Sequence, residues 1–280
     1  MKRITWFSTA LLVSVFTTTA TAQITPKATK LWITDTVLTG SESCFYDAER
    51  KAVYVSNGNT QSAAKDNDGF ISILEPTGQI KTLHWVKEGL HAPKGMAKIG
   101  NKLIVSDIDA VKVIDIPTGT LEKTIEIEGS VFLNDVTTDG RNCYVSDTRT
   151  GTVYKLDTSF NVTKIIENCP GINGLAFKDQ LYALDSEGMK KFSNDGNYTP
   201  TLVTDQVKGG DGLIIVDQNT FIASRWGGQV FVIKGTKAHL VIDTQGEKSN
   251  TADIDYIADQ HLLLVPTFLK NQVAGYKLEF

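Results

Sequence analysis

The stretch from Asn134 to Asp147, NDVTTDGRNCYVSD, contains the pattern that decides the fold. A polar residue opens a short apolar run, a turn rich in Asp, Gly and Asn follows, and a second apolar run ends in Ser-Asp. Short apolar runs bounded by such turn residues are typical of strands joined in a hairpin. The stretch therefore predicts two neighbouring antiparallel strands.

The same phrase recurs along the chain at regular spacing. The intervals between successive copies range from 38 to 52 residues, and each copy opens with a polar residue: Glu42, Lys94, Asn134, Asn173, Asp211 and Asp253. Most copies are followed by a third strand, and several by a fourth, as in residues 111–119 and 121–127. A repeat of about 43 residues with four strands has the length of one propeller blade. We therefore predict an all-β fold, a six-bladed β-propeller with four-stranded antiparallel blades.

The two ends of the repeat array predict how the ring closes. The last strand, residues 273–278, can pair with the first, residues 28–33, and this pairing leaves fewer exposed sheet edges. An eight-stranded barrel is the main all-β alternative, but the number of strands and the repeat period argue against it. We expect residues 23–280 to form one propeller domain.

The first 22 residues have the pattern of an export signal. Lys2 and Arg3 form a positive segment, residues 4–16 are largely apolar, and residues 20–22 read Ala-Thr-Ala, a small-x-small cleavage pattern. A membrane anchor is the alternative, but the apolar stretch is too short to span a bilayer. We expect cleavage after Ala22, no membrane span in the mature chain, and a periplasmic or secreted protein.

Charge and cysteine content exclude some classes of function. The formal net charge is -4, whereas nucleic-acid binders are usually basic, so we expect no nucleic-acid partner. Cys44, Cys143 and Cys169 make an odd number, which permits at most one internal disulfide. Their spacing does not indicate a structural zinc site, and buried free thiols are the simplest expectation.

The residue that opens each repeat is predicted to face the central channel, because the innermost strand of a blade lines it. Three of the six are acidic, and Lys94 is the single cation. A lone buried polar residue usually finds a local hydrogen-bond partner. Converging carboxylates, in contrast, repel each other unless a cation neutralises them. A hard cation held by oxygen ligands is one solution, and Lys94 is another.

Several of these positions also resemble the motifs of a known family. The resemblance is carried, in order and at blade spacing, by residues 40–54, 133–135, 172–174 and 210–212. They are similar to motifs of the senescence-marker-protein/gluconolactonase family, which includes regucalcin and consists of six-bladed propellers with one divalent metal on the channel axis. The resemblance implies that Glu42, Asn173 and Asp211 are metal ligands and that Asn134 binds substrate.

The chemistry implied by this resemblance is metal-assisted opening of a lactone or related small ester. The cation would polarise the carbonyl, and Asp211, the candidate catalytic base, or else Asp253, would deprotonate the attacking water. Lys94 and Asp253 join Asn134 as predicted substrate-binding residues. An all-oxygen ligand set makes calcium the first candidate, with magnesium or zinc as alternatives.

A non-catalytic exported propeller that binds a small ligand or a protein partner in the same pocket is the second hypothesis. Phe132 stands where the family often has an arginine, and Lys94 has no role that the resemblance assigns. Both observations favour binding without turnover. The retained Glu42, Asn173 and Asp211 favour the hydrolase, so the sequence leaves both hypotheses open.

Overall fold

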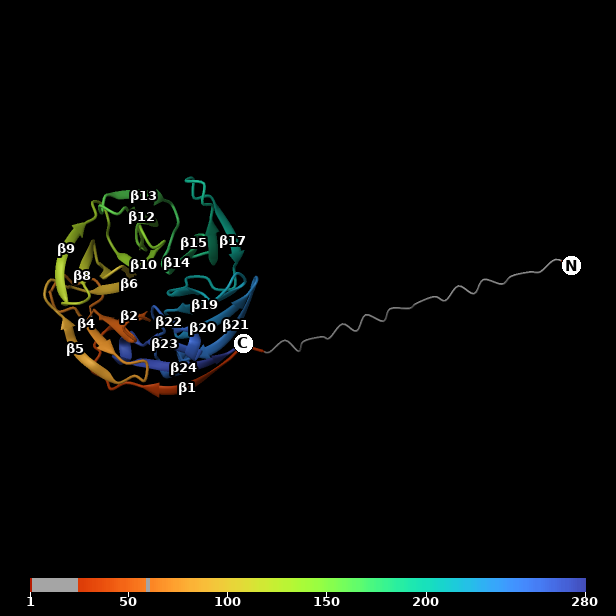
Figure 1. The fold of residues 1–280 in the computed structure, drawn as a ribbon, viewed down its shortest axis with the longest axis horizontal. Coiled ribbons are helices and arrows are strands. Elements are labelled where there is room, and N and C mark those ends of the chain that lie inside the picture. Colours follow the sequence, from red (N-terminus) through yellow and green to blue (C-terminus); the bar gives the residue numbers. More distant parts are fainter. Residues whose placement is uncertain (2–24, 59–60) are drawn as a thin grey trace.

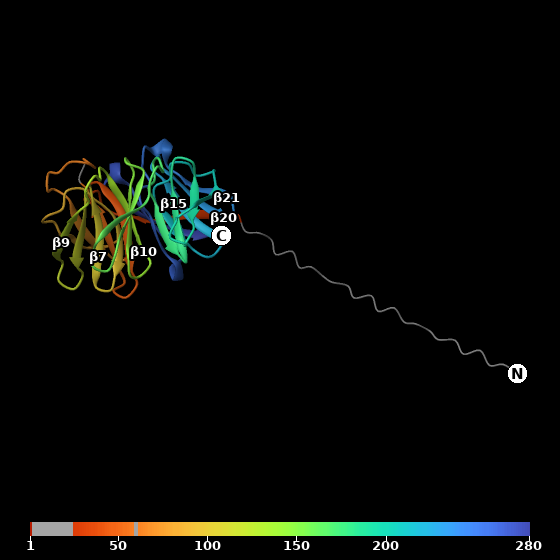
Figure 2. The same cartoon turned by 90° about the horizontal axis from the view of Figure 1, so that it is seen from above.

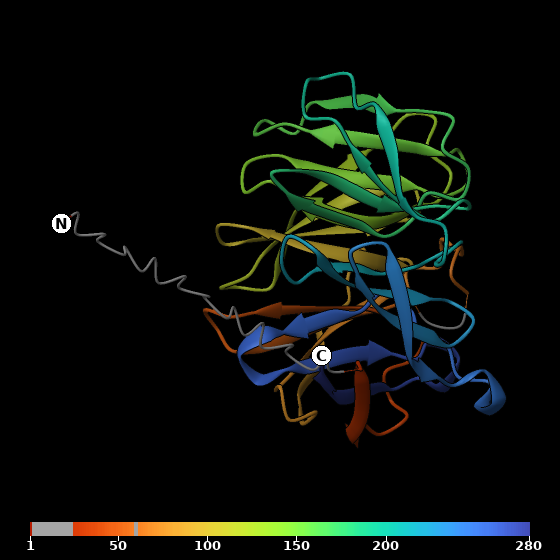
Figure 3. The same cartoon turned by 90° about the vertical axis from the view of Figure 1, so that its right-hand side faces the viewer.

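The computed structural model of the protein describes Met1, residues 25–58 and residues 61–280. Apart from Met1, the predicted signal segment lies outside the described residues. The described chain forms six four-stranded antiparallel sheets arranged in a ring (Figure 1). Figures 2 and 3 show from the side that the strands run between the two faces of the ring, where the loops gather. The predicted six-bladed propeller is confirmed.

Each of the first three blades is a four-stranded meander that runs from the innermost strand outward. Blade 1 consists of β2 (Ser41–Asp47), β3 (Ala52–Asn57), β4 (Phe70–Leu74) and β5 (Ile80–Val86). Blade 2 consists of β6 (Pro93–Ile99), β7 (Lys102–Asp107), β8 (Ala110–Asp115) and β9 (Thr120–Glu126). Blade 3 consists of β10 (Leu133–Thr138), β11 (Cys143–Asp147), β12 (Thr152–Leu156) and β13 (Val162–Ile166).

The next two blades repeat this order, and the sixth combines both ends of the chain. Blade 4 consists of β14 (Leu175–Lys178), β15 (Gln180–Leu184), β16 (Met189–Phe192) and β17 (Pro200–Thr204). Blade 5 consists of β18 (Leu213–Ile215), β19 (Thr220–Arg225), β20 (Gln229–Lys234) and β21 (Lys237–Asp243). Blade 6 consists of β22 (Asp255–Ile257), β23 (Leu262–Pro266), β24 (Val273–Glu279) and β1 (Lys27–Ile33).

Helical structure in the described residues is limited to three single turns of 3-10 helix. These are η1 (Gln245–Glu247), η2 (Ala258–Gln260) and η3 (Phe268–Lys270). No helix of the described part of the chain is long and apolar enough to cross a membrane.

Blade 6 closes the ring in the predicted way. Strand β1 pairs antiparallel with β24, with Ala28 opposite Leu278 and Ile33 opposite Ala274, and the two strands lie side by side in Figure 1. The Trp32 ring covers Gly275, where a Cβ atom would lie only 2.2 Å from it. A glycine is therefore needed for the aromatic ring to pack against the closing strand.

The apolar core of the described residues is divided into six clusters, one at each interface between neighbouring blades. Strand β3 shows why, because successive side chains point to opposite faces of a sheet. Val53 and Val55 pack toward blade 6, and Tyr54 between them packs toward blade 2. Inner strands are therefore apolar on both faces. Cys44, Cys143 and Cys169 are buried in this core as free thiols, as expected.

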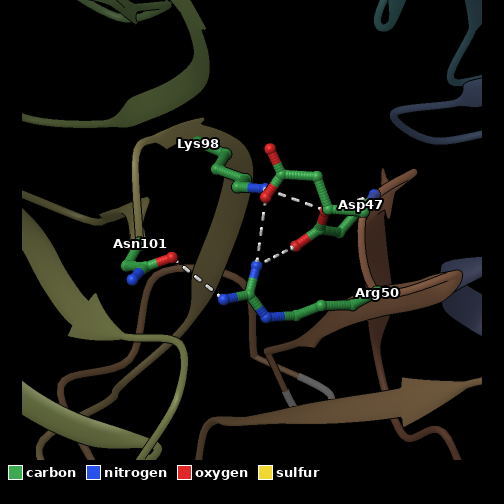
Figure 4. Close-up of polar contacts among 5 residues, drawn as sticks. Asp47, Arg50, Lys98 and Asn101 are labelled. Carbon is green, nitrogen blue, oxygen red and sulfur yellow. Dashed lines mark hydrogen bonds and ion pairs between the residues drawn. The ribbon is translucent and has the colours of Figure 1, made fainter.

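Polar contacts also join neighbouring blades, as a network between blades 1 and 2 shows (Figure 4). Asp47 accepts hydrogen bonds from Arg50 of its own blade and from Lys98 of blade 2, both at 2.9 Å. Arg50 also donates to Asn101 across the interface at 3.0 Å. The network links the C-terminal ends of two innermost strands.

Buried serines position the N-terminal ends of the innermost strands. The register shifts within β2 and β10, at the points where Glu42 and Asn134 lie. A serine hydroxyl of the adjacent strand accepts a backbone N–H in this region, as in the pairs Ser43–Ser56, Asp135–Ser146 and Gly212–Ser224 at 2.8 to 3.0 Å. Serines near the ends of β3, β11 and β19 therefore support the start of the adjacent innermost strand.

Candidate functional site

The six repeat-opening residues lie at the same end of the six innermost strands. Three of them are the second residues of β2, β6 and β10, and the other three lie two residues before the first residues of β14, β18 and β22. Backbone hydrogen bonds extend the ladder to them, as in Asp211 N–H to Ser224 O at 2.8 Å. The innermost strands surround the centre of the ring (Figure 1), so the ring geometry brings these residues toward one axis.

Glu42 and Lys94 form a buried ion pair between blades 1 and 2. Lys94 Nζ lies 3.6 Å from Glu42 Oε1, and the exposed fractions of the two side chains are 1% for Lys94 and 7% for Glu42. The other carboxylate oxygen, Glu42 Oε2, is buried and has no hydrogen-bond partner in the described structure. Buried polar atoms almost always have a partner, so this oxygen requires an explanation.

Asn173 and Asp211 form a second pair, between blades 4 and 5. Asn173 Nδ2 donates to Asp211 Oδ1 at 2.7 Å, while Asn173 Oδ1 is buried without a partner among the described residues. Burial raises the pKa of Asp211 well above its ordinary value, and the carboxylates of Glu42 and Asp253 raise it further. The Asn173 amide and the Lys94 ammonium oppose that rise in pKa. The two pairs therefore share one electrostatic environment.

The residues present fit a hard cation. Glu42 Oε2 and Asn173 Oδ1 are both buried oxygens without a partner, and Asp211 hydrogen-bonds directly to Asn173. An oxygen set of carboxylates and an amide suits calcium or magnesium, whereas zinc sites usually include His or Cys. Among the described residues, no cluster of three or more His, Cys, Asp or Glu side chains forms a metal site. The candidate set therefore depends on the amide oxygen of Asn173.

Asn134 and Asp253, the other predicted pocket residues, have different surroundings. Asn134 is buried, and its Nδ2 donates to Thr148 Oγ1 at 3.1 Å, which fixes the amide at the wall of blade 3. Asp253 Oδ2 accepts a hydrogen bond from Ser43 Oγ at 2.6 Å. Asp253 also lines a cavity of about 280 Å³ that none of the other five residues lines. Asp253 is therefore the repeat-opening residue that borders this cavity.

A further buried acid, Asp135, was not predicted from the sequence. Its Oδ2 accepts the Leu175 N–H of blade 4 at 2.5 Å, and its Oδ1 accepts the N–H of Val136. Burial raises the pKa of Asp135 to about 7, despite these two hydrogen bonds. The available signal was its position directly after a repeat-opening residue, where three other blades have glycine.

Those glycines have a packing role. A Cβ atom on Gly174 would lie 2.1 Å from the carbonyl oxygen of Asp211, and one on Gly212 would lie 2.6 Å from Asp253 Oδ1. The neighbouring blade therefore approaches so closely that only glycine fits. In the Asn173-Gly174 and Asp211-Gly212 pairs, the first residue is a candidate site residue, and the glycine allows the neighbouring blade to pack closely.

The protein is similar to known proteins in its structure, whereas comparisons of its sequence found no match. No family model matches the sequence, and no curated protein matches it. A solved protein provisionally described as a gluconolactonase has a TM-score of 0.67 at 18% identity, covering 91% of this chain and 92% of its own. A gluconolactonase from Xanthomonas campestris has a TM-score of 0.66 at 16% identity, covering 86% of both chains.

A solved structure of different biological context shares the same fold. One chain of a nidogen/laminin complex has a TM-score of 0.64 at 16% identity, covering 76% of this chain and 83% of its own. At such identities the likeness establishes the fold alone. The predicted six-bladed architecture is therefore the one that gluconolactonases have, and propellers of this kind host unrelated functions.

Proposed function

We propose that the protein is a hydrolase of lactones or related small esters, with a divalent metal held by Glu42, Asn173 and Asp211. The observation that carries the proposal is the presence of two buried oxygens without a partner, Glu42 Oε2 and Asn173 Oδ1, beside the Asp211 carboxylate. The gluconolactonases among proteins of the same fold support this reaction class. Calcium is the metal that this oxygen set favours first.

The residues of the pocket have separate roles in this proposal. A bound divalent cation supplies polarisation of the lactone carbonyl and stabilises the negative charge that develops on its oxygen. Asp211 accepts the proton of the attacking water. Asn173 donates to Asp211 Oδ1 and so fixes the orientation of this carboxylate. Asn134, held by Thr148, orients the substrate at the wall of blade 3.

The test combines metal analysis with kinetics on the purified protein. We expect bound divalent metal, hydrolysis of neutral lactones that a chelator abolishes, and a fall in kcat of about 100-fold or more in Asp211→Asn, because a general base contributes about that much. Asp217→Asn removes an exposed carboxylate of the same blade and serves as the matched control. A protein without metal and without chelator-sensitive turnover would rule out the hydrolase.

Binding without turnover remains the second candidate function, and Lys94 is the observation that favours it. Its ammonium lies 3.6 Å from Glu42 and so supplies part of the positive charge that a metal would otherwise bring. In that case the purified protein contains no metal, and a ligand binds in the presence of a chelator. The metal analysis therefore separates the two functions before any substrate is known.

A further inference from the structure

Phe132, two residues before Asn134, contacts two cationic side chains. Lys94 Nζ lies 4.7 Å from the centre of the Phe132 ring, and Arg149 Cζ lies 4.5 Å from it. Lys94 is buried and paired with Glu42. Arg149 is exposed, and no described carboxylate forms an ion pair with it. One aromatic ring thus contacts both the buried cation of the pocket and an exposed cation.

The backbone around Arg149 is fixed to the pocket wall. The buried Asp147 carboxylate accepts the N–H of Phe132 at 3.2 Å and the N–H of Arg149 at 3.1 Å. Between these residues, the Thr148 N–H donates to Phe132 O, and Thr148 Oγ1 accepts the amide of Asn134. The turn that carries Arg149 and the strand that carries Asn134 are therefore held together by hydrogen bonds that are partly shielded from solvent.

This arrangement suits the recognition of an anion. A guanidinium group that lies over an aromatic ring keeps its N–H groups free, and their planar fork matches the two oxygens of a carboxylate. The other ionisable groups near the channel are mostly carboxyl groups, those of Glu42, Asp135, Asp211 and Asp253, and the Lys94 ammonium is already paired with Glu42. An acidic ligand therefore needs a local cation, and Arg149 is placed beside Asn134 to supply it.

We propose that Arg149, positioned on Phe132, binds a carboxylate substituent of the substrate, so that the preferred substrate is an acidic lactone. This inference rests on the proposed lactone hydrolysis and adds the class of substrate. Arg149 binds the acidic substituent away from the ester bond, while Asn134 contacts the ring of the lactone. Lys94 remains paired with Glu42 and contributes only to the positive potential at this wall.

The test compares two lactones that differ in one group. D-Glucaro-1,4-lactone has a carboxylate at the carbon where D-glucono-1,4-lactone has a hydroxymethyl group. We expect Arg149→Gln to raise KM for the acidic lactone about tenfold or more, since a charge-assisted hydrogen-bond pair is lost. KM for the neutral lactone should change less than about twofold, because that substrate makes no charged contact. Arg149→Lys should recover part of the affinity, since it keeps the charge without the fork.

Arg141→Gln is the matched control. It removes the same charge from an exposed arginine in the turn between β10 and β11, at the other end of the innermost strand. Equal losses for both lactones in Arg149→Gln, or an equal effect of Arg141→Gln, would overturn the inference. Calorimetric titration with the two lactones decides the case even without turnover. If the wild-type protein hydrolyses neither lactone but still binds the acidic one selectively, the hydrolase is contradicted and the role of Arg149 is not. If the wild-type protein binds both lactones equally, the role of Arg149 is contradicted.

Discussion

Lys94 places a positive charge inside a pocket whose other charged groups are carboxylates. Its exposed fraction is 1%, and its only ion-pair partner among the described residues is Glu42. Burial of both charges costs several kcal/mol per ion in desolvation, and their mutual attraction offsets this cost. A metal ion and Lys94 would act on the same carboxylate. Their contributions to stability are therefore coupled and can be measured together.

Lys94→Met is expected to destabilise the metal-free protein by about 3 kcal/mol, because it leaves the buried Glu42 charge without a partner. Saturating calcium should recover more stability in this variant than in the wild type, because a more negative pocket attracts the cation more strongly. Urea unfolding in chelator and in calcium measures both quantities.

The matched control for Lys94→Met is Lys112→Met. Lys112 is also buried and lies 3.8 Å from the Asp107 carboxylate, but on β8 of blade 2 rather than among the repeat-opening residues. Its loss of stability should be the same in chelator and in calcium. If Lys94→Met behaves in the same way as this control, calcium does not bind beside Glu42.

At the scale of single elements, the residues that lead into the innermost strands combine two tasks. Asn173 faces the pocket, whereas Gly174 allows blade 5 to approach blade 4. Gly174→Ala is expected to destabilise the protein by about 1–3 kcal/mol, because the added methyl group would overlap the Asp211 carbonyl oxygen and push the two blades apart. Gly246→Ala, at a position with open space around the Cβ site, should change stability by less than about 0.5 kcal/mol. Chemical unfolding of both variants checks this pair.

The strands and their order could be predicted because they depend on local patterns. Apolar alternation and turn residues repeat along the chain. The pairing that closes the ring could be predicted because both ends of the repeat array have the pattern of a strand. The contacts within the pocket could not be predicted in the same way. Glu42 meets Lys94, and Asn173 meets Asp211, only because the ring brings separate blades together.

Other features escaped prediction for reasons of register and orientation. The pairing of β2 and β10 with their neighbouring strands shifts in register at Glu42 and Asn134, and periodicity alone does not reveal such a shift. Asp135 was not predicted because the neighbouring Asn134 is the predicted pocket residue of blade 3. In the structure, Asp135 accepts a hydrogen bond from the backbone of blade 4. The site residues could be proposed from the repeat, whereas their partners required coordinates.

At the scale of the whole molecule, the ring concentrates acidic groups along its channel. Asp135, Asp253 and Asp255 all line the cavity of about 280 Å³ beyond the candidate metal site. Burial raises the pKa of Asp255 to about 6 and that of Asp135 to about 7. The folded state therefore keeps protons on these groups at pH values where the unfolded chain has lost them. The channel should make the stability of the entire propeller depend on pH.

The sign of this dependence follows from proton linkage. Between the ordinary carboxyl pKa and the raised value, the folded state binds more protons than the unfolded state, so stability falls as pH rises. Asp47 acts in the opposite sense. Burial raises its pKa, but donors from Lys98 and Arg50 outweigh this and keep it below the ordinary value, so its contribution is lost only in stronger acid. Above about pH 5 the raised groups therefore dominate.

We therefore expect the free energy of unfolding, measured with urea in the presence of chelator, to decrease between about pH 5 and about pH 8. Asp255→Asn should make that decrease smaller by on the order of 1 kcal/mol, because the titrating group is removed. The variant also loses one acceptor, since Asp255 accepts the N–H groups of both Tyr46 and Tyr256. The loss of that hydrogen bond lowers stability equally at every pH. The informative quantity is therefore the slope of the free energy of unfolding against pH. Parallel pH profiles for wild type and variant would show that Asp255 is ionised in the folded state throughout this range.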